Sequence, residues 1–154
     1  DMTQKNLFAP LLAGGTLAIP DEYFDPAAIA ALIDAQQVTV INCAPSAAYQ
    51  LVEAPERWSA LASLRLLALG GEAIRLSHLR AWLQSAQCRA RLLNMYGPSE
   101  CTDIAIAADY AKGEAAGHAV TVPIGRPIHN CSAYVLNERM KLQPRGAIGE
   151  LFLG

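Results

Sequence analysis

The sequence predicts an α/β fold, in which a mostly parallel sheet is flanked by helices and the C-terminal third is rich in β-strands. Between about residues 16 and 100, segments with helical spacing of apolar residues alternate with short apolar runs. Strands that alternate with helices form parallel sheets covered by those helices. After residue 103 the helical spacing fades, and strand-like runs are joined by turns that contain Gly and Pro.

Three segments are predicted helices. The first spans residues 25–37, with Asp25 placed to cap it and a proline in its first turn. A shorter helix follows a proline over residues 45–53, and a third spans residues 77–87 with Ser77 as its cap.

The predicted strands are short apolar runs rich in β-branched residues or leucine. They are residues 38–42, 64–71 and 90–96 in the first part of the chain, and 104–110, 131–138 and 147–154 in the last. We treat residues 1–154 as one segment, with an α/β portion over about 1–105 and a β-rich portion over about 106–154. Because the chain starts at Asp1 and stays apolar to its last residues, we expect the parent domain to continue at both ends.

The composition excludes several classes of protein. An apolar share of 53% and a charged share of 17% favour a folded chain over a disordered one. A formal net charge of −2 gives no reason to expect nucleic acid or an anionic membrane as a partner. The sequence has no apolar run near the ~20 residues that span a bilayer, and no signal-peptide pattern. Four cysteines without a CxxC pair indicate reduced thiols, so we expect a cytoplasmic protein.

Three loops follow predicted strands, at residues 42–45, 70–72 and 96–100. Ligands of doubly wound α/β sheets bind at the carboxyl ends of the strands, so we expect the loops to form one site. The pair Gly70-Gly71 has two equally favoured interpretations, a close approach of another group to the backbone or a simple left-handed turn. The sequence has no GxGxxG or GxxxxGK motif to support a dinucleotide fold or a P-loop.

The turn at residues 98–100 also has two interpretations. Pro98 suits the first turn of a short helix, whose free N–H groups would bind a phosphate together with the Ser99 hydroxyl. Glu100 would repel that phosphate unless a divalent cation such as Mg²⁺ lies between them. The alternative, which physical argument alone slightly favours, is a capped turn in which Glu100 stabilises the helix dipole.

A family resemblance extends over essentially the whole chain. The segment NMYGPSE (94–100) resembles the N-x-Y-G-P-T/S-E motif of adenylate-forming enzymes, specifically the amino-acid adenylation domains of nonribosomal peptide synthetases. LALGGEAI (67–74) resembles their glycine-rich loop beside adenine, and LLAGGTLAIP (11–20) resembles the strand after their substrate-site helix. Residues 122–154 resemble the segment that ends in their GELxIxG motif. The resemblance implies a flavodoxin-like subdomain that holds the substrate pocket.

On the nucleotide side, the resemblance implies an ATP-binding set. Its members are Gly71, Asn94, Tyr96, Gly97 and Ser99. Asn94 would hydrogen-bond the adenine amino group, Tyr96 would stack on the ring, and Gly71 would lie along the adenine edge. Ser99 would contact the α-phosphate and Glu100 would bind Mg²⁺, which makes these two the catalytic candidates.

On the substrate side, the resemblance implies a pocket for an amino acid. Its members are Asp1, Met2, Lys5, Asn42, Ala68, Gly70, Met95, Asp103 and Ile104. Asp1 would pair with the substrate's α-ammonium group, which distinguishes amino-acid activators from acyl ligases. Either Lys5 bridges Asp103 inside a modest pocket, or Asp103 meets a hydroxyl or cationic group of the substrate. The small and polar residues favour a polar amino acid over a large aromatic one.

The implied reaction joins ATP and an amino acid into aminoacyl-AMP, with loss of pyrophosphate. The amino acid then passes to the phosphopantetheine thiol of a peptidyl carrier domain, in a synthetase that also holds a condensation domain. We expect the isolated chain to be inactive, because parts that the family needs are absent from this sequence. We also expect it to be prone to self-association, because an excised subdomain exposes apolar surface that its parent would cover. Two alternatives stay open, namely a segment of an acyl-CoA or aryl-acid ligase and a non-catalytic binding or scaffold module.

Overall fold

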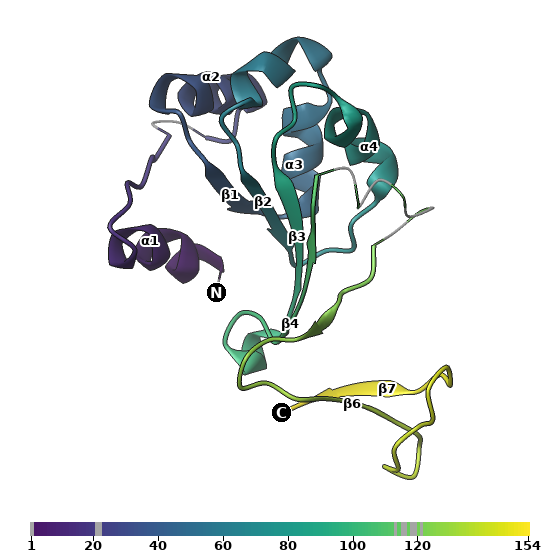
Figure 1. The fold of residues 1–154 in the computed structure, drawn as a ribbon. Helices are drawn as coiled ribbons and strands as arrows, with labels where there is room; N and C mark the ends of the chain where they lie inside the picture. Colours follow the sequence, from purple (N-terminus) through teal and green to yellow (C-terminus); the bar gives the residue numbers. More distant parts are fainter. Residues whose placement is uncertain (1, 21–22, 113, 115–116, 118–119, 121) are drawn as a thin grey trace.

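The computed structural model describes residues 2–20, 23–112, 114, 117, 120 and 122–154. Its helices are α1 (Met2–Leu12), α2 (Pro26–Gln36), α3 (Pro45–Val52), α4 (Leu76–Gln84) and the 3₁₀ helices η1 (Pro55–Leu61) and η2 (Ser99–Cys101). Its strands are β1 (Val40–Cys43), β2 (Leu66–Gly70), β3 (Arg91–Tyr96), β4 (Ile106–Tyr110), β5 (Arg126–Pro127), β6 (Ala133–Leu136) and β7 (Glu150–Leu153). The predicted α/β class is therefore confirmed (Figure 1).

Five strands form the main sheet in the order β1-β2-β3-β4-β5. The first three run parallel, whereas β4 pairs with β3, and β5 with β4, in antiparallel fashion. Strands β6 and β7 form a separate antiparallel pair near the C-terminus (Figure 1). The β-rich C-terminal third thus contributes two strands to the main sheet and a hairpin beyond it.

The predicted helix over residues 25–37 is confirmed, with its predicted cap. The Asp25 carboxylate accepts a hydrogen bond from the Ala27 N–H at 2.9 Å, and Pro26 occupies the first turn. Gln37 ends the helix in the left-handed conformation, with φ of 49°.

Two sequence predictions about secondary structure are wrong. Helix α4 begins at Leu76, so Ser77 lies inside its first turn and does not cap it. The buried Leu76 donates its N–H to the Val120 carbonyl at 3.0 Å, and this tertiary contact fixes the helix start. The segment LLAGGTLAIP (11–20), which resembles a strand of the family, is not a strand here, since residues 11–12 end α1 and residues 15–20 have no regular structure.

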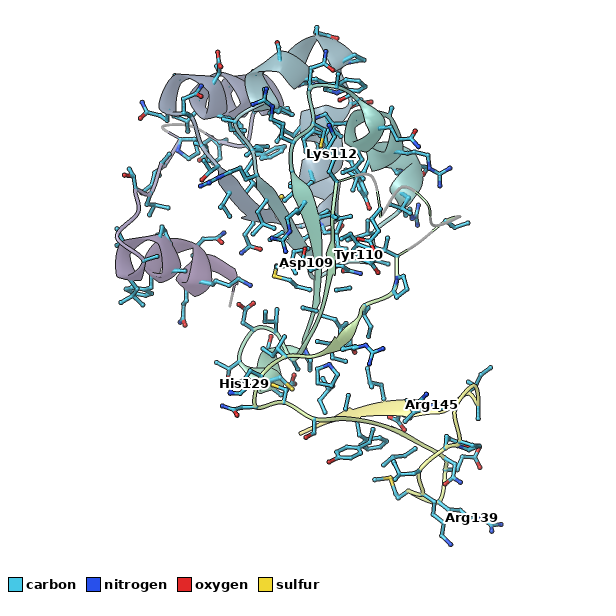
Figure 2. The ribbon with its side chains drawn as sticks, viewed as in Figure 1. Asp109, Tyr110, Lys112, His129, Arg139 and Arg145 are labelled. Carbon is cyan, nitrogen blue, oxygen red and sulfur yellow. The ribbon has the colours of Figure 1, made fainter. Side chains whose placement is uncertain are left out.

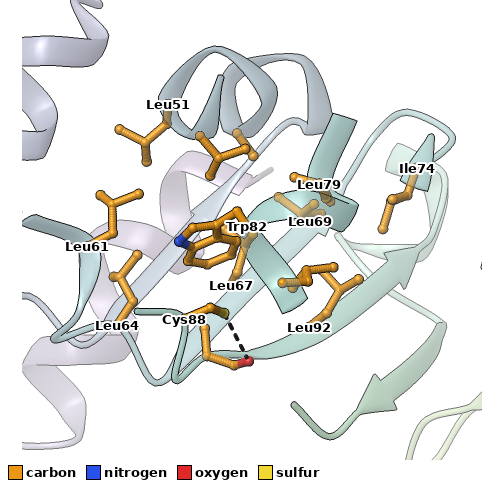
Figure 3. Packing of buried hydrophobic residues seen from close by; sticks show 14 of the residues in the cluster. Leu51, Leu61, Leu64, Leu67, Leu69, Ile74, Leu79, Trp82, Cys88 and Leu92 are labelled. Atoms are coloured by element: carbon orange, nitrogen blue, oxygen red, sulfur yellow. Dashed lines mark hydrogen bonds between the residues drawn. The ribbon is translucent and has the colours of Figure 1, made fainter. Parts of the chain in front are cut away.

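The core lies between one face of the sheet and the layer of α2, α3 and α4. Figure 3 shows Trp82 of α4 packed among leucines of the strands and the neighbouring helices. Since side chains alternate across a strand, Leu67 and Leu69 of β2 face this core while Ala68 faces the other side. On that other side α1 lies beside the sheet edge, apart from α2–α4 (Figure 1).

Helix α1 presents an exposed apolar face. Its exposed side chains are Leu7, Phe8, Leu11 and Leu12. In the part of the chain that the structure describes, no helix is both long and apolar enough to cross a membrane.

We expect the isolated chain to self-associate through this face of α1, because contact between two copies would remove apolar area from water at about 25 cal/mol per Å². Sedimentation velocity at rising protein concentration measures the association. Phe8→Ser combined with Leu12→Ser should restore a monomer. Leu142→Ser changes another exposed leucine, which lies in the β6–β7 hairpin, and should leave association unchanged. Association that depends on Leu142 and not on α1 would contradict the prediction.

Candidate functional site

A cavity of about 230 Å³ opens where β2 and β3 end. Its lining residues are Gly70, Gly71, Met95, Gly97, Ser99, Asp103 and Ile104. All seven belong to the sets predicted from the sequence, and they come from both the nucleotide and the substrate side. The structure thus brings together residues as far apart in the chain as Gly70 and Ile104.

A larger hollow of about 370 Å³ lies elsewhere, in the connection that joins the two strands of the C-terminal hairpin. Its lining runs from Leu136 to Arg139 and from Ile148 to Glu150, with Gln143 between them. Figure 2 shows Arg139 extending from this hairpin, far from the main sheet. None of the predicted site residues lines this hollow, so the smaller cavity is the better candidate.

Two glycines form one wall of the cavity. Gly71 has φ of 86°, the left-handed conformation that favours glycine, so the turn interpretation of Gly70-Gly71 describes the observed backbone. A Cβ on Gly70 would lie 3.1 Å from the Met95 carbonyl oxygen of the neighbouring strand. Gly70 therefore allows β2 and β3 to pack closely where they reach the cavity.

The opposite wall is a tight turn after β3. The Ala105 N–H donates to the Tyr96 carbonyl at 3.0 Å, which returns the chain beside the strand end. Thr102 and Asp103 have φ of 58° and 96°, conformations that are strained for residues other than glycine. This turn directs the Asp103 carboxylate towards α1, where it meets Lys5.

Gly97→Ala is expected to lower the free energy of unfolding by about 2 kcal/mol. The added Cβ would lie 2.5 Å from the Asp103 carbonyl oxygen and 2.7 Å from the Ile104 Cα, both of them backbone atoms that cannot rotate away. Urea denaturation of the isolated chain measures the loss. Gly117→Ala is the control, since a Cβ added there would have no heavy atom of the described residues within 4 Å. Equal unfolding midpoints for the two variants would refute the steric argument.

An ion pair joins α1 to Asp103 in the cavity lining. Lys5 Nζ lies 2.7 Å from Asp103 Oδ2, and it also donates to Met95 Sδ at 3.5 Å. Both charged side chains are largely shielded from water, at 28% and 18% exposed. Of the two arrangements that the sequence left open, the structure has the one in which Lys5 bridges Asp103.

An amide pair joins α1 to β1 next to this ion pair. Asn42 Nδ2 donates to Asn6 Oδ1, and Asn6 Nδ2 donates to the Asn42 carbonyl at 3.0 Å. Asn42 Oδ1 is buried and has no hydrogen-bond partner among the described residues. Asn42 lies beside Ala68, on the sheet face that also carries Met95. Sequence reasoning missed Asn6, because its only signal is its neighbour Lys5.

On the predicted nucleotide side, Asn94, Tyr96 and Glu100 lie outside the cavity lining. Asn94 is buried on the core face of β3, and its Nδ2 donates to the Val122 and Pro123 carbonyls at 3.4 and 3.0 Å. These bonds orient the amide and leave its carbonyl oxygen as the acceptor that an adenine amino group requires. Tyr96 and Glu100 are exposed beside the cavity. Asp1 lies outside the described residues, and Met2 is the first residue of α1.

Burial raises the pKa of the Cys43 thiol from 9.0 to about 11, and the nearby Glu72 carboxylate raises it further, against a backbone hydrogen bond at Ala48 that lowers it. Cys43 is the last residue of β1. Because its pKa is raised, its thiol is protonated at neutral pH.

The Cys43 shift predicts a loss of stability in alkali. The folded-state pKa exceeds the unfolded value, so the stabilisation is complete below pH 9 and is lost as the pH rises towards 11. Two pKa units correspond to roughly 2–3 kcal/mol. Urea unfolding between pH 8 and 11 should therefore show a steeper decline for the natural chain than for Cys43→Ala. Parallel declines would contradict the prediction.

Comparisons with known proteins identify the family. The family described as AMP-binding enzyme matches residues 1–154. Tyrocidine synthase 3 of Brevibacillus parabrevis is 35% identical, over 98% of this chain and 2% of the synthase. The dimodular nonribosomal peptide synthase of Bacillus subtilis (strain 168) is 37% identical, over 99% of this chain and 7% of the synthase.

Solved structures share the fold. PA1221, an NRPS protein containing adenylation and PCP domains, aligns with a TM-score of 0.85 at 24% identity, over 99% of this chain and 30% of that chain. The α-methyl-L-serine-AMP bound form of the nonribosomal peptide synthetase FmoA3 aligns with a TM-score of 0.82 at 27% identity, over 97% of this chain and 17% of that chain.

The chain therefore belongs to the AMP-binding enzyme family, as a segment of the adenylation-domain type found in nonribosomal peptide synthetases. It spans 2% and 7% of the length of the two synthetases that it matches.

Proposed function

We propose that this chain forms the substrate-pocket part of a domain that activates an amino acid. The complete domain converts ATP and the amino acid into aminoacyl-AMP, and then loads the amino acid onto the phosphopantetheine thiol of a partner carrier domain. A condensation domain uses the loaded residue, and the synthetase acts in the cytoplasm. The observation that carries the proposal is the cavity in which Gly71 and Ser99 lie beside Met95 and Asp103.

The nucleotide occupies the side of the cavity formed by Gly71, Gly97 and Ser99. The Ser99 hydroxyl contacts the α-phosphate, and the exposed Tyr96 ring covers the adenine. Glu100 binds Mg²⁺, which neutralises charge on the phosphates when bound. Among the described residues no group of three or more acidic, histidine or cysteine side chains could hold a metal by itself. Phosphate oxygens and water would supply the remaining ligands of an ion held by Glu100, a pattern that Mg²⁺ commonly adopts.

The amino acid occupies the side of the cavity where Asp103 pairs with Lys5. Asp1 pairs with its α-ammonium group, and its side chain meets Met95, Ile104 and the Lys5–Asp103 pair. A charged side chain would compete for one member of that pair and leave the other shielded and uncompensated, which is costly. A large side chain would not fit, because the cavity of about 230 Å³ also serves the phosphate. We propose a small, uncharged, polar amino acid.

Amino-acid-dependent ATP–pyrophosphate exchange by the complete adenylation domain tests the proposal. The panel holds the common amino acids, ornithine, and aryl and fatty acids. Exchange with small uncharged polar amino acids is the expected result. Exchange with Asp, Glu, Lys or ornithine would overturn the proposed substrate class while leaving the activity intact.

Two other outcomes would overturn more than the substrate class. Exchange with aryl or fatty acids alone, unaffected by Asp1→Ala, would identify an acyl or aryl-acid ligase. The absence of any exchange from a folded domain would favour a binding or scaffold module.

A further inference from the structure

The glycine wall of the cavity continues into an irregular connection. Residues 71–74 link β2 to α4 without regular structure, and three of them are exposed. Gly71 itself adopts the left-handed conformation and has the backbone freedom of glycine. A wall of this kind keeps one position only if other parts of the fold hold it.

Glu72 attaches this connection to the N-terminus of α3. Its Oε2 accepts the Ser46 N–H at 3.1 Å, and its Oε1 accepts the Ser46 hydroxyl at 2.9 Å. Pro45 begins the helix, and Ala44 at the cap position makes no side-chain cap hydrogen bond. The first N–H groups of a helix lack partners within it, and a carboxylate there is favoured by the helix dipole. Glu72 therefore caps α3 from 26 residues away.

Tyr49, three residues further along α3, holds the rest of the connection. Its hydroxyl accepts the Arg75 N–H at 2.6 Å and donates to the Ala73 carbonyl at 3.5 Å. Its ring stacks on His78, with centroids 4.6 Å apart and planes inclined by 20°. Positions 46 and 49 lie on one face of the helix, so the two side chains act side by side.

Helix α3 is itself firmly fixed. Its other face places Ala48, Leu51 and Val52 in the core, each no more than 4% exposed. The contacts of Ser46 and Tyr49 therefore tie the irregular backbone that follows a glycine turn to a packed helix.

We propose that Glu72 is a positioning residue for the nucleotide, and that Ser46 and Tyr49 act with it as a clamp. The clamp fixes the Gly70–Gly71 wall relative to Gly97 and Ser99 across the cavity. Because the placement of a binding wall governs the fit of the ligand, losing the clamp weakens ATP binding more than it slows the reaction. This inference rests on the proposed binding of ATP at Gly71.

The test is steady-state exchange kinetics on the complete adenylation domain with Glu72→Ala and Glu72→Gln. Glu72→Ala should raise the KM for ATP about tenfold and leave the KM for the amino acid and kcat within about twofold. Glu72→Gln keeps one acceptor oxygen and should fall between. Tyr49→Phe keeps the ring against His78 but loses both hydroxyl bonds, so it should also raise the KM for ATP. Glu53→Ala, at the other end of α3, is the matched control.

A double-mutant cycle tests whether the two side chains act as one unit. If they do, adding Ser46→Ala to Glu72→Ala should raise the KM for ATP little beyond its value in Glu72→Ala alone. An unchanged KM for ATP in Glu72→Ala, with only a lower Tm, would overturn the proposal and leave Glu72 a purely structural cap. If the natural domain shows no amino-acid-dependent exchange, the proposed function fails. Calorimetry with AMP alone then tests the clamp. The clamp predicts that Glu72→Ala binds AMP more weakly than the natural domain does, and equal affinities of the two would refute it.

Discussion

Replacing Trp82 with alanine is expected to lower the free energy of unfolding of the isolated chain by about 3–5 kcal/mol. Trp82 is 1% exposed and is the largest fully buried side chain, and it joins α4 to the sheet (Figure 3). Removing a buried tryptophan costs about 3–5 kcal/mol, because transfer energy is lost and a cavity remains. A domain of this size has roughly 5–15 kcal/mol of stability in total. Urea denaturation followed by far-UV circular dichroism measures the change.

A pair of phenylalanine variants isolates the packing term. Trp82 Nε1 has no hydrogen-bond partner among the described residues. Trp82→Phe therefore reduces the volume of the ring without removing a hydrogen bond that the structure shows. Trp58 Nε1 donates to the Val52 carbonyl at 2.8 Å, so Trp58→Phe leaves a carbonyl without its donor. We expect Trp82→Phe to retain most of the stability that Trp82→Ala loses. A Trp82→Ala variant as stable as the natural chain would refute the assignment of Trp82 to the core.

The regular elements could be predicted because their signals are local. The cap at Asp25 and the proline after it define the start of α2 within one helical turn. Short apolar runs predicted β1, β2 and β3, and the glycine pair that starts at Gly70 predicted the end of β2. The start of α4 could not be predicted in the same way, since it depends on a hydrogen bond from Leu76 to Val120, 44 residues away.

The candidate site shows the same division between local and distant information. Loops at strand ends led to Gly70, Gly97 and Ser99, because the carboxyl ends of parallel strands share one edge of the sheet. The pairing of Lys5 with Asp103 was one of two open arrangements, and only the position of α1 relative to the turn after β3 decides it. Contacts that depend on such positions leave no pattern in the sequence.

The position of Asn94 shows what a motif hides. NMYGPSE reads as one continuous site, yet alternation along β3 sends Asn94 to the core face and Met95 to the cavity. Two backbone carbonyls hold the Asn94 amide from a segment near residue 122. Adenine bound by this residue would therefore lie along the strand end, beyond the cavity that Met95 lines.

Glu100→Gln is expected to reduce ATP–pyrophosphate exchange by the complete adenylation domain about 10²–10³-fold. Glu100 lies exposed on η2 and makes no hydrogen bond or ion pair within the described residues, so the substitution removes a negative charge without removing a contact that supports the fold. The variant should therefore keep the Tm of the natural domain. Its residual activity should require a higher Mg²⁺ concentration, which a titration of exchange rate against Mg²⁺ measures.

Two further variants test whether Glu100 acts as a metal ligand or as a charge that caps η2. Glu100→Asp keeps the carboxylate on a shorter side chain and should recover part of the activity at high Mg²⁺. Glu138→Gln removes an exposed carboxylate beside the C-terminal hairpin and should behave as the natural domain does. If Glu100 only stabilised the dipole of η2, Glu100→Gln would lower the Tm slightly and leave the Mg²⁺ dependence unchanged. A metal-binding role requires an unchanged Tm and an altered Mg²⁺ dependence, because a metal ligand without structural contacts affects the reaction and not the fold.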